Sequence, residues 1–204
     1  MTKADQSFIA AVARQSTATV HEALGKKGAL PSDIKPVTRG MKLCGPAFTV
    51  HALPGENLTI HQALYQAQRG DVLVVSVSGH YEAGYWGEIM AVAAVARGIV
   101  GLVIDGCVRD SAEMTRMNFA AFSRGLCIRG TAKHGGGVLN KPLVIGDVVV
   151  NPGDMVLGDD DGVVVIPQED FGTIVEKAEK RVATEDKIMA RLRGGESTLD
   201  IYKF

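Results

Sequence analysis

The stretch at residues 84–110, GYWGEIMAVAAVARGIVGLVIDGCVRD, constrains the fold more than any other part of the chain. Its alanine-rich middle, residues 88–97, has high helix propensity, and Gly98 stands where a left-handed residue commonly ends a helix. The almost wholly apolar run at residues 100–104 is typical of a strand buried on both faces. The stretch therefore predicts a helix that is followed directly by a buried strand.

Groups with binding chemistry stand at both ends of this unit. The glycine-punctuated turn at residues 84–87 opens the helix, whose first N–H groups lack intrahelical acceptors and can hold an anion. At the other end, Asp105 and Gly106 predict a turn, and Arg109 and Asp110 come after it. Arg109 offers a planar fork for a carboxylate or an enolate, and Asp110 offers hard oxygen ligands for Mg²⁺ or Mn²⁺. If the fold joins the two ends, they form a site for an anionic, metal-chelating small molecule.

The same residues also have a structural interpretation. Arg109 and Asp110 could form a surface ion pair at a strand end, and Glu88 could be a carboxylate that favours the first turn of its helix. Lys133 lies in the glycine-dense segment 131–137, TAKHGGG. This segment could cradle phosphate with backbone N–H groups, but it matches neither a P-loop nor a dinucleotide-binding fingerprint. Spacing alone leaves these alternatives open.

The rest of the chain predicts one α/β domain over residues 1–204, with mixed sheets and helices on the outside. No Pro/Ser-rich linker divides it. Besides the central unit, helices are expected at 7–25, 58–68, 111–117 and 168–193, and strands at 45–52, 71–75, 120–122 and 127–129. From residue 143 short apolar runs alternate with tight turns, and Asp161-Gly162 predicts a hairpin. The acidic tip at 159–161 is more typical of a solvated turn than of a metal site.

Composition and missing motifs narrow the function further. A net charge of −1 and the lack of a long apolar run argue against nucleic acid and membrane as partners. The N-terminal segment has no secretory apolar region, and the three cysteines, widely spaced without a CxxC, are predicted to be reduced packing residues. We therefore expect a cytoplasmic protein. Without a G-x-S-x-G or HExxH motif, acyl-enzyme chemistry and a peptidase zinc site are poorly supported.

The residues from 86 to 110 resemble those of the RraA-like family, named after a regulator of RNase E activity, which includes the class II 4-hydroxy-4-methyl-2-oxoglutarate/4-carboxy-4-hydroxy-2-oxoadipate aldolases. The family hallmark is an acidic residue, twenty intervening residues and then Arg-Asp, which Glu88, Arg109 and Asp110 match. Characterised aldolases often carry Asp where this chain has Glu88. The resemblance extends over most of the chain, through TATVHEALG, GPAFTV, GDVLVV, RGTAKHGGGVLNKPLVIGDVVVNPGD and GDDDGVVVIP.

This resemblance implies a three-layer β/β/α swivelling-type sandwich and a homotrimer or dimer of trimers with sites at subunit interfaces. It implies a divalent metal, Mg²⁺ or Mn²⁺, held by Asp110 largely through waters. Glu185 of a neighbouring subunit is expected to reach the metal waters, so the C-terminal helix and tail, residues 168–204, are expected at a subunit interface.

The resemblance also assigns the substrate contacts. Backbone N–H groups of residues 87–90 are expected to grip a pyruvyl carboxylate, while Arg109 holds the pyruvyl oxygen and stabilises the enolate. Thr131 is expected to line the same pocket. The implied substrate-binding residues are Gly87, Glu88, Ile89, Met90, Arg109 and Thr131, and the implied catalytic residues are Arg109, Glu88 and Lys133.

The implied activity is a pyruvate-releasing aldolase that cleaves a 4-hydroxy-2-oxo acid through a pyruvate enolate and also decarboxylates oxaloacetate. Two alternatives remain open. One is a binding protein that inhibits a ribonuclease by protein contact, as the member that named the family does. The other is a lyase or hydratase on another 2-oxo acid, for which the polar loop at residues 76–82 could reshape the distal part of the pocket.

Overall fold

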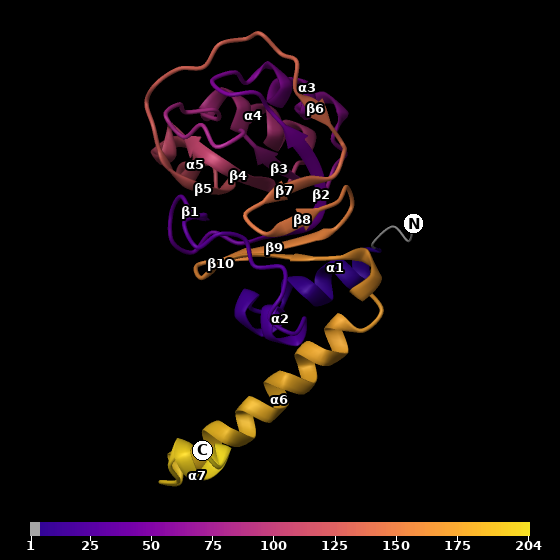
Figure 1. Ribbon diagram of the computed structural model, residues 1–204, viewed down its shortest axis with the longest axis vertical. Coiled ribbons are helices and arrows are strands. Elements are labelled where there is room, and N and C mark those ends of the chain that lie inside the picture. The colour runs from indigo at the N-terminus through magenta and orange to yellow at the C-terminus, as the bar shows by residue number, and fades with distance from the viewer. Residues whose placement is uncertain (1–4) are drawn as a thin grey trace.

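Four apolar runs form the parallel centre of a large sheet in the computed structural model, which describes residues 5–204 (Figure 1). The strands pair in the order β5-β4-β3-β2, and their middle members are buried on both faces, as their unbroken apolar sequences predict. Their bounds are β2 (Leu43–His51), β3 (Val72–Ser76), β4 (Gly101–Val108) and β5 (Ala120–Leu126).

Three helices connect these strands and cover one face of the sheet. They are α3 (Leu58–Gln66), α4 (Glu88–Arg97) and α5 (Ser111–Arg116). The predicted bounds of α4 are confirmed, and Gly98 ends it with a left-handed φ of 72°. The apolar sides of α3 and α4 pack on the sheet in one core that includes Ile60, Leu64, Leu73 and Ala91.

The remaining strands make the sheet mixed and curve it into a nearly closed barrel. The first half of β2 pairs antiparallel with β9 (Met155–Asp159), which forms the predicted hairpin with β10 (Gly162–Ile166). At the other end of the strand order, β1 (Lys35–Pro36) pairs with β5 and also contacts β10. A second core, which includes Val74, Phe122 and Val156, fills the space enclosed by the curved sheet. Short strands complete this region: β6 (Val138–Leu139), β7 (Leu143–Ile145) and β8 (Val148–Val150).

Helices α1 (Gln6–Ala13), α2 (Thr17–Ala23) and α6 (Ile174–Arg193) pack around the outer side of the β9–β10 hairpin. Only the first part of α6 lies on the body, and its second half projects away as an arm that ends in α7 (Thr198–Tyr202) (Figure 1). The predicted α/β fold with a mixed sheet and outer helices is confirmed. None of the helices within residues 5–204 combines the length and the apolar character that crossing a membrane requires.

Three local predictions are wrong. The Asp105-Gly106 pair does not form a turn, because β4 runs through it to Val108 with a register shift between Ile104 and Cys107. Residues 127–129 form no regular strand, because pairing of β5 with β4 ends at Leu126. The predicted helix at 168–193 is interrupted, since a 3₁₀ turn at Gln168–Asp170 precedes α6.

Candidate active site

The candidate site lies where β4 ends and α4 begins, two points that are separated in sequence by the whole helix and strand but are adjacent in the fold. The backbone N–H of Arg109 donates to the carbonyl oxygen of Trp86 at 2.8 Å, which joins the strand end to the glycine turn. Asp110 follows in the left-handed region, with φ 56° and ψ 42°. Residues other than glycine seldom occupy this region, and those that do often mark functional positions.

Two glycines permit this close approach. A Cβ atom on Gly84 would lie 2.2 Å from the carbonyl oxygen of Cys127, and one on Gly87 would lie 2.3 Å from Asp110 Oδ2. Both distances are far below van der Waals contact, so any side chain would separate the glycine turn from its neighbours. The glycine punctuation of residues 84–87 is therefore a steric requirement of the site.

The Asp110 carboxylate binds the start of α4. Its Oδ2 accepts a hydrogen bond of 2.9 Å from the backbone N–H of Glu88 and lies 3.7 Å from Nε of Arg109. No acceptor among residues 5–204 bonds to the next two N–H groups of the helix, those of Ile89 and Met90. Arg109 and Asp110 are both partly exposed, with 45% and 39% of their side-chain surface accessible. The ion pair is thus open to a ligand.

A pocket of about 280 Å³ surrounds this pair. It contains Arg109, Asp110, Lys133 and Thr131 together with backbone of the glycine turn and the first turn of α4. The full lining is Asn57, His61, Gly84, Tyr85, Trp86, Gly87, Ile89, Met90, Arg109, Asp110, Gly130, Thr131 and Lys133. The fold therefore brings together most of the residues that the sequence suggested.

Asn57 and His61 line the pocket and are functional candidates that the sequence did not suggest. Asn57 is buried, with its Oδ1 accepting a 2.5 Å bond from Lys133 Nζ and its Nδ2 donating to the carbonyl oxygen of Tyr85 at 2.7 Å. It stands at the start of α3 but makes no side-chain capping bond. An asparagine before a helix suggests a cap, so only the tertiary contacts reveal that Asn57 links Lys133 to the glycine turn.

His61 enters the pocket from α3, one helical turn after Asn57. Burial lowers the pKa of its imidazole, and the positive charge of Lys133 lowers that pKa further. Both effects favour the neutral ring at pH 7. A histidine in the middle of a helix is usually a surface or packing residue, and its sequence position gives no signal of the pocket.

Two of the suggested residues do not reach the pocket with their side chains in a single chain. Glu88 is exposed at the start of α4, and its contact with the site is the backbone bond to Asp110. Glu185 lies on α6, where its Oε1 is 2.9 Å from Nε of Arg181. Because Glu185 was expected to act on a neighbouring subunit, its role remains a prediction.

The glycine segment 131–137 has an acidic partner within the chain. Gly135 donates its N–H to Oε2 of buried Glu56 at 3.2 Å, and Gly137 donates to Oγ1 of Thr59 at 3.2 Å. Main-chain bonds between Ala132 and residues 55 and 57 fix the same segment. These contacts favour a structural role, because they use N–H groups that a phosphate would need.

The polar loop at residues 76–82 does not line this pocket. Within it, Ser78 Oγ lies 3.0 Å from Nε2 of His51, and His80 Nδ1 lies 2.7 Å from the hydroxyl group of Tyr85. Tyr85 in turn accepts a bond from the N–H of Gly55 at 2.8 Å. The loop therefore contacts Tyr85 of the glycine turn but does not itself line the pocket.

The donor set is compatible with a weakly coordinated Mg²⁺ or Mn²⁺. Asp110 is a partly exposed carboxylate, and these ions commonly bind one or two carboxylates, keeping several waters and taking further ligands from the substrate. Residues 5–204 contain no cluster of three or more His, Cys, Asp or Glu side chains that could enclose an ion. The residues present thus fit an open site and not a closed structural one.

Comparisons with known proteins identify the family of the chain. The family model RraA-like, described as Aldolase/RraA, matches residues 17–165. A protein from Halalkalibacterium halodurans named "Putative 4-hydroxy-4-methyl-2-oxoglutarate aldolase" is 36% identical over 186 residues, which cover 91% of this chain and 89% of that protein.

Three solved structures are similar to this chain in both fold and sequence. An uncharacterized protein from Pseudomonas syringae is 32% identical with a TM-score of 0.85, over 96% of this chain and 92% of the other. RraAS2 from Streptomyces coelicolor, titled an unusual member of the RNase ES inhibitor RraA protein family, is 27% identical with a TM-score of 0.80, over 93% and 98% of the two chains. The RNA-processing inhibitor RraA from Thermus thermophilis is 26% identical with a TM-score of 0.68, over 74% of this chain and 92% of that one.

Proposed function

The chain belongs to the RraA-like family, and we propose that it is a divalent-metal-dependent aldolase that releases pyruvate from a 4-hydroxy-2-oxo acid. The single observation that carries the proposal is the meeting of Arg109, Asp110, Lys133 and the start of α4 in one open pocket. The similarity to the Halalkalibacterium halodurans protein supports the same reaction class. Substrates of the 4-hydroxy-4-methyl-2-oxoglutarate or 4-carboxy-4-hydroxy-2-oxoadipate type are part of the proposal.

The pocket provides contacts for the pyruvyl end of such a substrate. The N–H groups of Ile89 and Met90 are the available donors for its carboxylate, favoured by the positive end of the α4 dipole. Arg109 holds the 2-oxo oxygen. Asp110 would hold Mg²⁺ or Mn²⁺, which when bound would supply a Lewis acid for the 2-oxo group.

Bond cleavage then proceeds by a retro-aldol step. A water in the pocket takes the proton of the 4-hydroxyl group, C4 becomes a carbonyl carbon, and the electron pair of the C3–C4 bond passes into a pyruvate enolate. Arg109 stabilises the charge that develops on the enolate oxygen, and Lys133 contributes a second positive charge. Protonation at C3 completes pyruvate. Oxaloacetate gives the same enolate by losing CO₂, so we expect decarboxylase activity as well.

The test is a pyruvate-release assay with 4-hydroxy-4-methyl-2-oxoglutarate, 4-carboxy-4-hydroxy-2-oxoadipate and oxaloacetate, with Mg²⁺ or Mn²⁺ and with excess EDTA. We expect metal-dependent pyruvate formation well above the rate given by free metal, and inhibition by oxalate, which resembles the planar enolate. A folded, metal-supplied protein that produces no pyruvate from any of them would remove the proposal. The inhibitor-type relatives would then make a binding function the better interpretation.

The proposal includes the assembly and location of the enzyme. We propose a homotrimer or dimer of trimers in which the arm formed by α6 and α7 contacts a neighbouring subunit and delivers Glu185 to its site. A cytoplasmic location is consistent with the three free cysteines, since thiols persist in a reducing compartment.

A further inference from the structure

The ammonium group of Lys133 is a cation of the pocket that has no acidic partner. No ion pair among residues 5–204 includes Lys133, whereas Arg109 has Asp110 Oδ2 at 3.7 Å from its Nε. Lys133 Nζ instead donates to Oδ1 of Asn57 at 2.5 Å, and its next contact is Oγ1 of Thr131 at 3.5 Å. A neutral amide therefore holds this cation without cancelling its charge.

The side chain of Asn57 is fixed in one orientation. Its Oδ1 accepts from an ammonium group that can only donate, and its Nδ2 donates at 2.7 Å to the carbonyl oxygen of Tyr85, which can only accept. Nδ2 also lies 3.5 Å from Sδ of Met90, in the first turn of α4. Asn57 is only 5% exposed. Rotating the amide by half a turn would oppose two donors and two acceptors, so these contacts hold it in place.

Main-chain bonds fix Asn57 to the segment that carries Lys133. The N–H of Asn57 donates to the carbonyl oxygen of Ala132 at 3.1 Å, and the N–H of Ala132 donates to that of Gly55 at 2.8 Å. Asn57 is thus joined through its backbone to the residue before Lys133 and through its amide to the glycine turn. The place of the ammonium group relative to the start of α4 therefore depends on this one residue.

From these contacts we infer that Asn57 is a positioning residue for Lys133: its uncharged amide holds the ammonium group beside the start of α4 and leaves the positive charge available to an anionic ligand. The inference rests on the proposed function and adds the residue that keeps this charge both fixed and uncompensated. An aspartate of nearly the same shape would bind Lys133 at least as strongly but would cancel its charge. Position 57 therefore needs a neutral acceptor and not only a group of the right shape.

The order of two substitutions at position 57 tests the inference, with oxalate as the anionic probe in calorimetric titrations at a fixed excess of Mg²⁺. Asn57→Asp should weaken oxalate binding by about tenfold or more, the typical loss for one interaction with a charged group. Asn57→Ala should weaken it less, because the ammonium group loses its fixed position but keeps its charge. A purely structural link predicts the opposite order, since aspartate retains the bond to Lys133 that alanine loses. That opposite order would overturn the inference.

A double-mutant cycle with Lys133→Met measures whether the two residues act together. In the wild-type background Lys133→Met should weaken oxalate binding by about tenfold or more. In the Asn57→Asp background it should cost less than about threefold, because the charge is already cancelled. Losses that simply multiply would show that the residues act independently and would contradict the inference. If thermal denaturation shows that Asn57→Asp does not fold, the cycle is made with Asn57→Ala, where Lys133→Met should also cost less than in the wild type.

Gln62→Glu is the matched control, since Gln62 is an exposed residue of the same helix, α3, and does not line the pocket. It adds the same negative charge as Asn57→Asp and should leave oxalate affinity within about threefold of the wild type. An equal loss in both variants would show that any carboxylate on α3 has this effect and would overturn the inference, while the proposed aldolase would stand. A wild-type protein that neither binds oxalate nor releases pyruvate would instead remove the proposed function, and the inference with it.

Discussion

At the scale of single residues, Asp110 combines an unusual backbone conformation with two tasks. Its φ of 56° is left-handed, and its carboxylate both accepts from the N–H of Glu88 and faces the pocket. Asp110→Asn retains an oxygen acceptor for that N–H but loses the negative charge. We expect Mg²⁺ affinity to fall by more than tenfold and most turnover to disappear, with little change in Tm. Calorimetry with Mg²⁺ and thermal denaturation measure both, and Asp147→Asn, at an exposed turn, is the control.

Arg109 should act mainly in the transition state, because the enolate charge develops only as the C3–C4 bond breaks. Arg109→Lys keeps the charge but loses the planar fork. We expect kcat to fall by roughly two orders of magnitude, the usual loss for one donor to an oxyanion, with a small change in KM. Steady-state kinetics with oxaloacetate as the substrate measure kcat and KM for the variant and the wild type. A change confined to KM would show that Arg109 only binds the substrate.

Cys44 provides a pH prediction away from the site. Burial raises the pKa of its thiol from 9.0 to about 12. The folded protein therefore keeps this proton in a range where the unfolded chain loses it, so the stabilisation is fully present below pH 9 and is lost between pH 9 and 12. The Cys44 thiol can lower the free energy of unfolding by at most about 1.4 kcal/mol for each pH unit in this range. Denaturant unfolding at pH 8 and pH 10 measures the free energy of unfolding at each pH. This free energy should fall less from pH 8 to pH 10 in Cys44→Ala than in the wild type, and an equal fall in both proteins would contradict the prediction.

At the scale of elements, the start of α4 depends on Gly87. A Cβ atom there would lie 2.3 Å from Asp110 Oδ2 and 3.2 Å from Cγ of Arg109. Gly87→Ala should therefore displace the carboxylate from the helix start and lower kcat/KM by at least tenfold, with a stability cost of about 1–3 kcal/mol for overpacking. Gly172→Ala is the control, because its Cβ would have open space. Normal activity of Gly87→Ala would mean that the site does not need this close approach.

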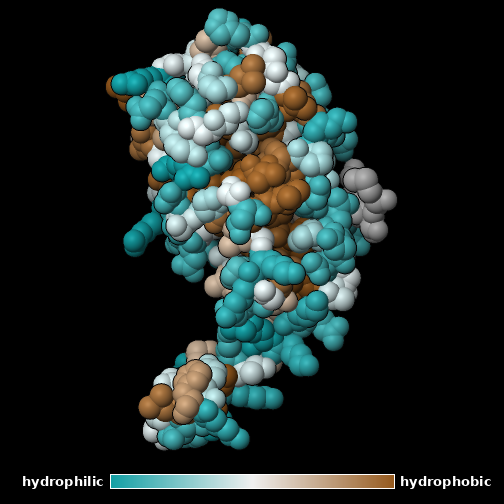
Figure 2. All heavy atoms as spheres, in the orientation of Figure 1, coloured by the Kyte–Doolittle hydropathy of each residue, from teal (hydrophilic) through white to brown (hydrophobic). Residues whose placement is uncertain are grey.

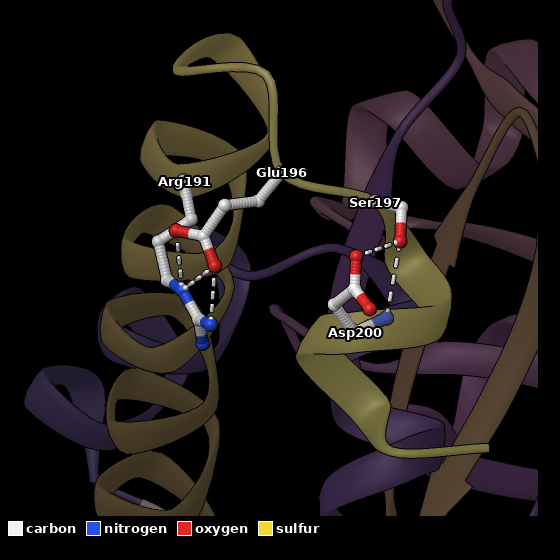
Figure 3. Close-up of polar contacts among 4 residues, drawn as sticks. All are labelled: Arg191, Glu196, Ser197 and Asp200. Carbon is white, nitrogen blue, oxygen red and sulfur yellow. Dashed lines mark hydrogen bonds and ion pairs between the residues drawn. The ribbon is translucent and has the colours of Figure 1, made fainter.

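At the scale of the whole molecule, the arm formed by the second half of α6 and by α7 projects away from the body of the chain (Figure 1). Its end is fixed by a two-pronged ion pair between Arg191 and Glu196 and by the Ser197–Asp200 cap of α7 (Figure 3). Apolar side chains gather on this end and over the β7–β8 hairpin (Figure 2). On the arm they include Leu199, Tyr202 and Phe204, which are 63%, 51% and 90% exposed. Such a cluster on a projecting element favours an interface.

We expect the protein to be a trimer or a multiple of a trimer at micromolar concentration. Replacing Leu199, Tyr202 and Phe204 with serine should shift it toward smaller species and reduce turnover, since Glu185 would no longer be held on a neighbour. Light scattering after size-exclusion chromatography measures the mass, and Lys203→Ser serves as the control. A monomeric wild type would contradict both the assembly and the role of Glu185.

The sequence by itself determined the elements whose information is local. The bounds of α4, its end at Gly98, and strands β3 and β4 follow from helix propensity, the left-handed preference of glycine and unbroken apolar runs, all of which act over a few neighbouring residues. The Arg109–Asp110 pair could be identified as a candidate for the same reason, because it follows a buried strand directly. The β9–β10 hairpin was likewise encoded in Asp161-Gly162.

Only the tertiary structure decided the rest. Strand β4 continues through Asp105 and Gly106 because β5 pairs with it beyond the register shift, and that partner is not visible in the local sequence. Asn57 has the sequence signature of a helix cap, yet its amide links Lys133, 76 residues away, to Tyr85. His61 likewise belongs to the pocket only because α3 packs beside α4. Contacts between distant segments depend on how the sheet curves and how its helices pack, and no residue's neighbours in sequence determine that.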